Sequence, residues 1–484
     1  MNQRRSMHVI VIGAGIGGLS AALDLASRGI KVSVLEQAPV PGGKMREIII
    51  DDQPIDSGPT VFTMRWVFEN LFKHAGTDIE DHLELHPCDR LARHAWTDGS
   101  KLDLYADRGQ SADAIAEFAD PKEAQRYLAF CKRAKNVYDT LYDSFMRSQR
   151  PSPWSLMRSS GWSGLLDLWR IQPFQTLWKS LGKSFRDPRL QGLFGRYATY
   201  CGSSPLLSPA TLMLIAHVEQ CGVWRVQGGM QRLAEALADR ISALGGSIHY
   251  RTPVRRLLAD QARAYGVELA NGDRLQADAL IANTDVAALQ QGELGPELAA
   301  TLPARRIRQR SLSAITFSML AAPSGMALAH HNVFFPANYP KEFKDIFEHD
   351  QVPHDPAVYV CAQPLKVNDD TSAHHSAKQR LFMITNAPAS GDHATFDRAV
   401  VDRVEASVFS LLSQCGLSID GESSQRVVTT PADFEARFPG TGGALYGASS
   451  HGWRASFSRT GSRSKIKGLY PEPSLKNSGQ TRLK

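Results

Sequence analysis

The fold of this chain is decided by one stretch near its N-terminus, His8-Val-Ile-Val-Ile-Gly13-Ala-Gly15-Ile-Gly17-Gly18. A β-branched apolar run ends there in glycines spaced as GxGxxG, and residues at helical spacing follow from Leu19 to Ser27. Gly13 allows a tight turn, Gly15 lets a backbone approach a pyrophosphate, and Gly18 lets helix and strand pack closely. The stretch therefore predicts a strand, a turn and a helix whose N-terminus faces a phosphate group.

A second strand follows this helix and ends in a carboxylate. Val32 to Leu35 form the strand after the turn at Gly29, and Glu36 comes next. A carboxylate about 20 residues after the glycines can bind the hydroxyls of an adenosine ribose. Because all parts occur in order, we interpret the unit as a dinucleotide-binding βαβ unit rather than as a glycine turn that only joins a strand to a helix. A second glycine element follows at short range, Pro41-Gly-Gly43-Lys44-Met45.

Length and composition indicate an ordered protein built from more than one module. The chain has 484 residues, of which 43% are hydrophobic and 21% charged. The net charge of +6 is modest and the basic residues are spread out, so nucleic-acid binding is not indicated, whereas contact with an anionic membrane surface is compatible with it. No run of about 20 apolar residues predicts a membrane-spanning helix. The apolar run Met7 to Ile12 breaks at Gly13, so we expect a strand instead of a signal peptide, and a cytoplasmic protein.

The cysteines give no sign of a metal site. They are far apart, and neither a CxxC pair nor a cluster of histidines accompanies them. We therefore expect no metal, and reduced, mostly buried thiols at six positions: Cys88, Cys131, Cys201, Cys221, Cys361 and Cys415.

The remaining sequence predicts five segments. Residues 1–65 begin the nucleotide-binding domain and 221–290 continue it, with a helix up to Leu244 and strands over Thr252–Leu257, Ala264–Leu269 and Leu275–Ala282. Residues 66–220 are mainly helical in pattern, notably Glu117 to Met146, and resemble a substrate lid. Residues 291–445 mix strands (Ala314–Leu320, Ala357–Ala362, Leu381–Asn386) with a helix over Phe396–Gln414 and should form the other wall of the substrate site. Residues 446–484 end the chain.

Tryptophans recur through the predicted lid among apolar and basic residues. They are Trp154, Trp162, Trp169 and Trp178. Such a mixture suits a membrane interface. The alternative is that these rings pack the core of the lid itself, and the sequence leaves both possibilities open.

The order of several motifs resembles a known family. After the N-terminal unit come Asp56-Ser-Gly-Pro-Thr60-Val61, His217-Val-Glu219 with Gly222-Val-Trp-Arg-Val-Gln-Gly-Gly-Met230, and Tyr446-Gly-Ala-Ser-Ser-His451-Gly-Trp453. Together they cover nearly the whole chain. They resemble the amine oxidase and phytoene desaturase superfamily and, within it, the bacterial carotenoid desaturases, most closely the hydroxyneurosporene or methoxyneurosporene dehydrogenases, which are 1-hydroxycarotenoid 3,4-desaturases.

The resemblance implies an α/β fold with a Rossmann-type FAD-binding domain, a mixed α+β substrate domain and a helical lid. It implies FAD as cofactor, with the matching segment at Thr60 and Val61 passing beside the flavin ring, Val254 clasping the adenine through its backbone, and Asn283 near the cofactor. The positions expected to bind FAD are Gly13, Gly15, Gly17, Gly18, Glu36, Gly43, Lys44, Thr60, Val61, Val254 and Asn283.

The implied reaction removes two hydrogens from carbons 3 and 4 of an acyclic hydroxycarotenoid. Its partners would be the long apolar carotenoid, a membrane surface on which the protein rests peripherally, and oxygen or a quinone as electron acceptor. The protein mainly has to align an allylic carbon with the flavin and exclude water, so no catalytic group is identified. His217, Glu219 and His451 are conceivable acid, base or hydroxyl-binding groups, although structural roles are favoured.

Two alternatives remain open at this point. The resemblance implies that residues 446–484 are a remnant of the C-terminal FAD-binding segment with an atypical tail. After Tyr470 the family continues with a glycine-rich turn and a helix, whereas this chain reads Pro471-Glu-Pro-Ser-Leu-Lys and ends in a polar, basic tail. An inactive or flavin-poor remnant that binds carotenoid is therefore one alternative. Other chemistry on the same fold, amine oxidation or carotenoid isomerisation, is the second.

Overall fold

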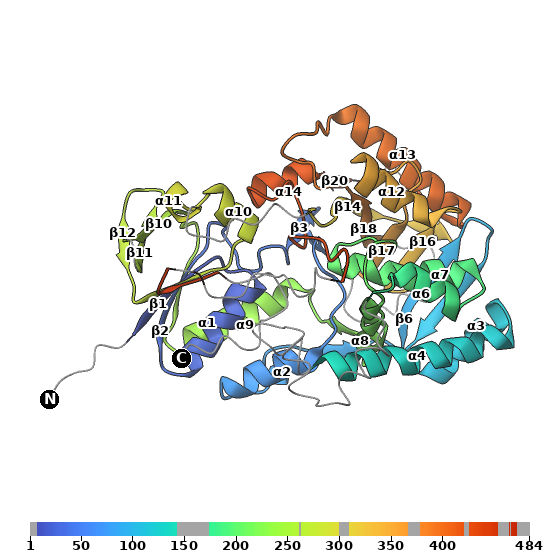
Figure 1. Cartoon of the computed structure of the whole chain (residues 1–484), viewed down its shortest axis with the longest axis horizontal. Helices are drawn as coiled ribbons and strands as arrows, with labels where there is room; N and C mark the ends of the chain where they lie inside the picture. Colours follow the sequence, from blue (N-terminus) through green and yellow to red (C-terminus); the bar gives the residue numbers. More distant parts are fainter. Residues whose placement is uncertain are drawn as a thin grey trace.

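The computed structural model describes residues 7–142, 174–260, 263–299, 309–365, 378–420, 425–453, 464 and 466–471. Figure 1 shows two parts. The part at the left contains the N-terminal βαβ unit, and in the larger part at the right helices lie on both sides of a sheet. No helix among the described residues is long and apolar enough to cross a membrane.

A five-stranded parallel sheet forms the core of the first part. Its order is β21-β13-β1-β2-β9, with these bounds: β1 (His8–Ile12), β2 (Lys31–Leu35), β9 (Ser247–His249), β13 (Ala279–Ala282) and β21 (Leu469–Pro471). Val9 and Val11 pack against α1 (Ile16–Ser27) and α9 (Gln231–Ala243) on one face, while Ile10 and Ile12 belong to the opposite face. Alternate residues thus fill two cores, as a doubly wound sheet requires.

A small antiparallel sheet covers the second face of the parallel sheet. It consists of β10 (Val254–Ala259), β11 (Ala264–Leu269) and β12 (Arg274–Gln276). The predicted continuous strand Leu275–Ala282 is wrong, because the chain leaves this sheet after Gln276. The backbone of Asp278 donates to the His8 carbonyl at 2.8 Å, and its carboxylate accepts from the His8 N–H at 2.8 Å. Residues from Ala279 onward therefore join β1 as β13.

A seven-stranded sheet forms the centre of the second part, in the order β20-β14-β18-β17-β16-β6-β7. The bounds are β6 (Arg90–Trp96), β7 (Lys101–Tyr105), β14 (Ser313–Ala321), β16 (His331–Phe335), β17 (Val358–Gln363), β18 (Gln379–Ala387) and β20 (Arg426–Thr429). Helix α13 (Arg398–Gln414) covers one face through Val404, Val408 and Leu412. The other face, which carries Val333 and Phe335, packs against helices from residues 108–220.

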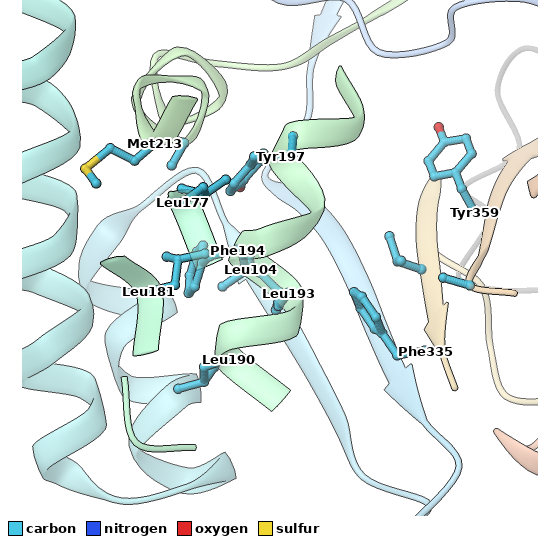
Figure 2. Close-up of a cluster of buried hydrophobic side chains, with 14 of the residues drawn as sticks. Leu104, Leu177, Leu181, Leu190, Leu193, Phe194, Tyr197, Met213, Phe335 and Tyr359 are labelled. Carbon is cyan, nitrogen blue, oxygen red and sulfur yellow. The ribbon is translucent and has the colours of Figure 1, made fainter. Parts of the chain in front are cut away.

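These helices form the predicted lid, and their bounds are α3 (Arg108–Phe118), α4 (Pro121–Leu141), α6 (Leu177–Ser184), α7 (Pro188–Gly195), η3 (Arg196–Cys201), η4 (Ala210–Met213) and α8 (Leu214–Gln220). Helix α4 begins where the Asp120 side chain accepts from the Glu123 N–H, with Pro121 in the first turn. In Figure 2 the side chains of Phe194 and Tyr197 lie among these helices, on the side of α7 and η3 that is turned away from the strands that carry Phe335 and Tyr359.

The described residues between 66 and 220 are mainly helical, as the sequence predicts, but the range also contains strands that the sequence analysis did not expect. β6 and β7 form a hairpin inside this range, and β6 pairs in parallel with β16. The sequence on both sides of this hairpin has helical periodicity, so its two strands were not predicted. Of the four tryptophans considered for a membrane interface, those at 154, 162 and 169 lie outside the described residues. Trp178 is partly buried and packs against the lid core.

The remaining elements connect these sheets and helices, and they are β3 (Glu47–Ile50), β4 (Gln53–Asp56), α2 (Arg65–His74), η1 (Ile79–Asp81), β5 (Leu85–Pro87), β8 (Trp224–Val226), α10 (Val286–Gln291), α11 (Pro296–Ala299), β15 (Pro323–Gly325), α12 (Tyr339–His349), β19 (Leu417–Ile419) and α14 (Pro431–Arg437).

Candidate cofactor and substrate site

The glycine fingerprint forms the turn between β1 and α1. Gly13 has a φ of +93° and its N–H donates to the Leu35 carbonyl at 2.8 Å. Gly15 is the N-cap of α1, no side chain caps this end, and the first turn, which contains Gly17, has no acidic residue. The helix thus begins with N–H groups and a partial positive charge available to an anion.

Close backbone approaches surround this turn. A Cβ on Gly18 would lie 2.2 Å from the Gly13 carbonyl oxygen, and one on Gly15 would lie 2.9 Å from the Asn283 side-chain nitrogen. A Cβ on Gly43 would lie 3.2 Å from the Gly15 Cα. The fold therefore brings Gly43 and Asn283, both remote in sequence, to the fingerprint, and side chains larger than hydrogen would fill the space at the helix start.

Glu36 lies at the carboxyl end of β2 and is 6% exposed. Its carboxylate accepts from the Ala14 N–H at 2.6 Å and from the Ala38 N–H at 2.8 Å. The Glu36 carbonyl accepts from the Thr252 N–H at 2.8 Å, and Val254 begins β10 two residues later. Glu36 and the start of β10 thus stand together on one side of the helix N-terminus.

The segment that contains Thr60 leads from the second glycine element to the large sheet. A Cβ on Gly58 would lie 2.1 Å from the Lys44 carbonyl oxygen. The Ser57 hydroxyl hydrogen-bonds to that of Ser318 on β14 at 2.7 Å, and Thr60 hydrogen-bonds to the Tyr359 hydroxyl on β17 at 2.7 Å. The predicted cofactor residues therefore follow one another in space along a path from Glu36, past Gly15 and Gly43, to Thr60.

Val61 stands at the end of this path. It is partly buried and packs against the hydrophobic core between the large sheet and the lid helices. The path therefore ends where the two layers of the second part meet.

Lys44 joins this path to a loop near the C-terminus. Its ammonium donates to the carbonyls of Ala444 and Leu445 at 3.2 and 2.8 Å, and burial lowers its pKa. The ammonium also lies 5.3 Å from the ring centroid of Phe438. The loop of residues 438–445 consequently borders the glycine cradle.

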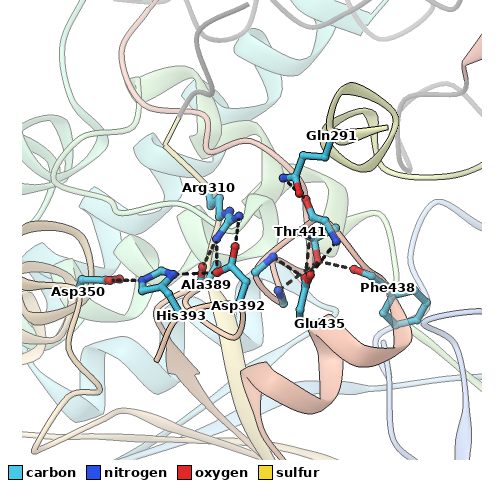
Figure 3. Close-up of polar contacts among 12 residues, drawn as sticks. Gln291, Arg310, Asp350, Ala389, Asp392, His393, Glu435, Phe438 and Thr441 are labelled. Atoms are coloured by element: carbon cyan, nitrogen blue, oxygen red, sulfur yellow. Dashed lines mark hydrogen bonds and ion pairs between the residues drawn. The ribbon is translucent and has the colours of Figure 1, made fainter. Parts of the chain in front are cut away.

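Glu435 fixes the conformation of this loop, as Figure 3 shows. Its carboxylate accepts from the N–H groups of Gly440, Thr441 and Gly442 at 2.7 to 2.9 Å. The Gln291 side chain on α10 donates to the Gly440 carbonyl at 2.9 Å. A charged acceptor thus satisfies three consecutive donors and ties the loop to the first part of the molecule.

An ion-pair chain holds the neighbouring surface (Figure 3). Arg310 binds both carboxylate oxygens of Asp392 at 2.8 and 2.6 Å, and these hydrogen bonds lower the pKa of Asp392 to about 2. His393 lies between Asp392 and Asp350, and the two carboxylates raise its pKa. This chain supports the loop and contacts none of the predicted cofactor positions.

Polar side chains form a band on the sheet face that meets the lid. The Tyr359 hydroxyl lies 2.6 Å from the His331 Nδ1, and the Arg196 guanidinium lies 5.3 Å from the Tyr359 ring centroid. Sequence reasoning did not identify these residues, because they come from η3, β16 and β17 and form no local motif.

The groups considered as acids or bases have structural partners. Glu219 is buried and accepts from the hydroxyls of Tyr197 and Tyr200, the latter at 2.7 Å. His451 accepts from the Ser204 N–H at 3.0 Å through Nε2, and burial lowers its pKa to about 4. His217 packs edge-on against Tyr138, with its Nε2 3.5 Å from Cys221 Sγ. These contacts support the structural roles favoured from the sequence.

Two carboxyl groups meet beneath the start of α9. Asp56 accepts from the Met230 N–H at 2.9 and 3.0 Å, yet burial raises its pKa to about 6. Burial, followed by the neighbouring Asp56, raises the pKa of Glu47 to about 7. Folding therefore favours the protonated form of both groups.

Glu47→Gln is expected to flatten the pH dependence of stability. Since the folded pKa of Glu47 exceeds its ordinary value of 4.5, its contribution is complete below that pH and is lost as pH rises through about 7. The half-exposed carboxyl is screened, so the effect should be on the order of 1 kcal/mol. Urea unfolding at pH 5 and pH 8 measures it: the wild type should lose more stability over this interval than the variant, and equal losses would contradict the assignment.

Comparison with known proteins places this geometry in a family. A model described as flavin containing amine oxidoreductase matches residues 16–323. The hydroxyneurosporene desaturase of Rubrivivax gelatinosus is 48% identical, over 96% of this chain and 88% of that protein. The hydroxyneurosporene desaturase of Rhodobacter capsulatus is 38% identical, over 96% of this chain and 93% of that protein.

A solved structure shares the fold at much lower identity. Putrescine oxidase bound to putrescine superposes with a TM-score of 0.59 at 16% identity, over 98% of this chain and 96% of that one. The α/β fold with a Rossmann-type FAD-binding domain is thereby confirmed. The chain belongs to the flavin-containing amine oxidoreductase family, in the group of the bacterial carotenoid desaturases.

Proposed function

We propose that this protein desaturates an acyclic hydroxycarotenoid by removing two hydrogens at carbons 3 and 4, with FAD as cofactor. The observation that carries the proposal is the 48% identity to a hydroxyneurosporene desaturase over almost the whole of both chains. The family is flavin-containing, and FAD is the flavin expected here. When bound, FAD would supply the hydride acceptor for the allylic carbon.

The residues on the path described above fit an extended dinucleotide. Glu36 and the start of β10 would hold the adenosine end, since a buried carboxylate there can bind ribose hydroxyls. The uncapped start of α1, between Gly15 and Gly43, would hold the pyrophosphate. The flavin end would then extend past Lys44 and Gly58 toward Thr60, which hydrogen-bonds to Tyr359 on β17, the central strand of the large sheet.

The substrate would lie between the large sheet and the lid. Val333 and Phe335 on the sheet, which belong to the same apolar core as the lid helices, offer an apolar environment there. Such surroundings suit a long polyene and exclude water from the reacting carbons. The chain's main tasks are orientation and desolvation, which agrees with the absence of any serine–histidine–aspartate arrangement among the motifs.

Product analysis tests the reaction directly. Purified protein loaded with FAD should convert 1-hydroxyneurosporene into a product that mass spectrometry finds two hydrogens lighter. A product of equal mass would indicate isomerisation instead and would refute desaturation. The comparisons give no support to isomerisation or to an inactive remnant, and the tail after Pro471 lies outside the described residues.

We further propose that the protein rests on a membrane surface, from which a carotenoid can enter. Three apolar side chains lie together and exposed: Phe174 is 76% exposed, Trp453 38% and Leu207 41%. The rings of Phe174 and Trp453 are 5.3 Å apart, and the Gly452 N–H donates to the Leu207 carbonyl at 2.9 Å. Exposed aromatic and aliphatic residues of this kind favour the bilayer interface.

The double substitution Phe174→Ser and Trp453→Ser is expected to weaken binding to anionic vesicles by at least about tenfold, because two aromatic anchors lose their apolar area. Co-sedimentation with phosphatidylserine vesicles measures this binding. Leu128→Ser on α4, at a residue 45% exposed, is the control and should sediment like the wild type. Unchanged sedimentation of the double variant would exclude this patch as the membrane contact.

Oxygen or a membrane quinone is proposed as the electron acceptor, since the sequence has a single dinucleotide fingerprint and no second one for NAD(P)H. Turnover that rises with added quinone under anaerobic conditions would support the quinone.

A further inference from the structure

Two histidines and a cysteine converge on the face of the large sheet that meets the lid. His331 on β16 and Cys361 on β17 are direct partners in an antiparallel pair, so their side chains point to the same side. His330 precedes His331. One ligand atom from each of these three residues lies within 4.8 Å of the others, and no other such group occurs among the residues that the structure describes.

Hydrogen bonds orient both imidazole rings. The His330 Nδ1 lies 2.9 Å from the Ala362 carbonyl, which can only accept, so this nitrogen carries the proton. The His330 Nε2 is then left with its lone pair and lies 3.7 Å from the Cys361 Sγ. Outer partners that fix one ring nitrogen while the other binds are the usual surroundings of a metal-ligating histidine.

His331 also has an outer partner at one ring nitrogen. Its Nδ1 lies 2.6 Å from the Tyr359 hydroxyl, which in turn hydrogen-bonds to Thr60 at 2.7 Å. The His331 side chain is 2% exposed, and its Nε2 is buried without a hydrogen-bond partner. A buried nitrogen without a partner costs free energy, and a bound ligand would remove this cost.

The Cys361 thiol is buried, with 1% of the residue exposed. A metal ion would displace the thiol proton to solvent and supply the cation that a buried thiolate requires.

We infer that His330, His331 and Cys361 bind one transition-metal ion of the zinc type. Two nitrogens and a sulfur are ligands for Zn²⁺ and similar ions, while Mg²⁺ and Ca²⁺ require oxygen ligands. The ion would join β16 to β17 beside Tyr359 and Thr60. The inference is independent of the proposed desaturation, because it rests on these three side chains alone.

Metal analysis of the tag-free, FAD-loaded protein tests the site. After a chelator wash, addition of one equivalent of Zn²⁺ and desalting, mass-spectrometric element analysis should find about one zinc per chain. Co²⁺ should give an ultraviolet thiolate charge-transfer band in a difference spectrum against the metal-free holoprotein. Zinc near zero without such a band would overturn the inference.

Variants distinguish a specific zinc site from adventitious zinc binding. Cys361→Ser and His330→Gln should each abolish stoichiometric zinc retention, and Tyr359→Phe should weaken zinc affinity by about tenfold through the orientation of His331. Cys415→Ser is the matched control, since Cys415 is equally buried and lies outside the three-residue group. Should Cys361→Ser not fold, His330→Gln, at a partly exposed residue, still decides the question. Retention of zinc by both variants would refute the assignment.

The zinc measurement and the desaturation assay fail separately. Product formation by a protein that retains no zinc would refute the metal site and leave the proposed function intact. Stoichiometric zinc without product formation would refute the proposed function and leave the metal site intact.

Discussion

Gly18→Ala is expected to abolish stoichiometric FAD binding. The new Cβ would lie 2.2 Å from the Gly13 carbonyl oxygen, 3.0 Å from the Asn283 side-chain nitrogen and 3.1 Å from the Asn283 Cβ. Backbone atoms cannot yield as a flexible side chain can, so α1 must move away from β1, and its N-terminus moves with it. An overlap that costs about 3 kcal/mol weakens binding on the order of 100-fold. Flavin absorbance per chain after gel filtration measures the loss.

Gly29→Asn provides the matched control at the other end of α1. Gly29 has a φ of +74°, a region that asparagine tolerates, and nothing lies within 4 Å of its Cβ position. This variant should retain flavin like the wild type. If Gly18→Ala also retained one flavin per chain, the fingerprint would not be the pyrophosphate site.

Phe194→Ala is expected to lower the free energy of unfolding by about 4 kcal/mol, the range for a buried phenylalanine in a packed core. Phe194 is 2% exposed, and its ring centroid lies 4.8 Å from that of Phe130 and 4.9 Å from that of Phe185. Figure 2 shows it among the apolar side chains that pack the lid helices together. The cavity would loosen α7 against α4, and with it the proposed substrate wall.

Chemical denaturation with an unchanged m-value measures this stability loss. Leu128→Ala on the exposed side of α4 is the control and should change stability by less than about 0.5 kcal/mol. Flavin binding at low denaturant should persist in Phe194→Ala, because the glycine fingerprint lies in a different core. A loss below about 1 kcal/mol would show that the lid can repack around the gap.

Local sequence signals predicted several elements of both parts well. The strand His8–Ile12 and the strand Ala264–Leu269 have the bounds that the structure shows, and the helix expected over Phe396–Gln414 runs from Arg398 to Gln414. These elements combine strong β-branched or helical periodicity with glycine or aspartate at their ends. Their local preferences agree with the tertiary structure, which makes such segments readable from one sequence.

Tertiary pairing decided the elements that sequence reasoning missed. β6 reads Arg90-Leu-Ala-Arg-His-Ala-Trp96, a run without a clear alternation, and its burial depends on parallel pairing with β16 some 240 residues later. The strand expected over Leu275–Ala282 divides because β13 pairs with β1. Neither pairing can be recognised from the pattern of residues in a sequence window of about ten residues.

The candidate site shows the same division. Gly13 and Gly43 were predicted from glycine motifs and Asn283 from the family resemblance, and the structure brings the three together. The group of His331, Cys361 and Tyr359 was not predicted, since it arises from the register of β16 against β17. Single residues on neighbouring strands form no spacing that a sequence alone can reveal.

Flavin-dependent desaturation is tested by an anaerobic titration of the FAD-loaded protein with 1-hydroxyneurosporene. We expect an oxidised-flavin band of one equivalent per chain, bleached in proportion to added substrate, with a product two hydrogens lighter. A protein without a flavin band, or a flavin band that substrate leaves unchanged, would contradict flavin-dependent desaturation.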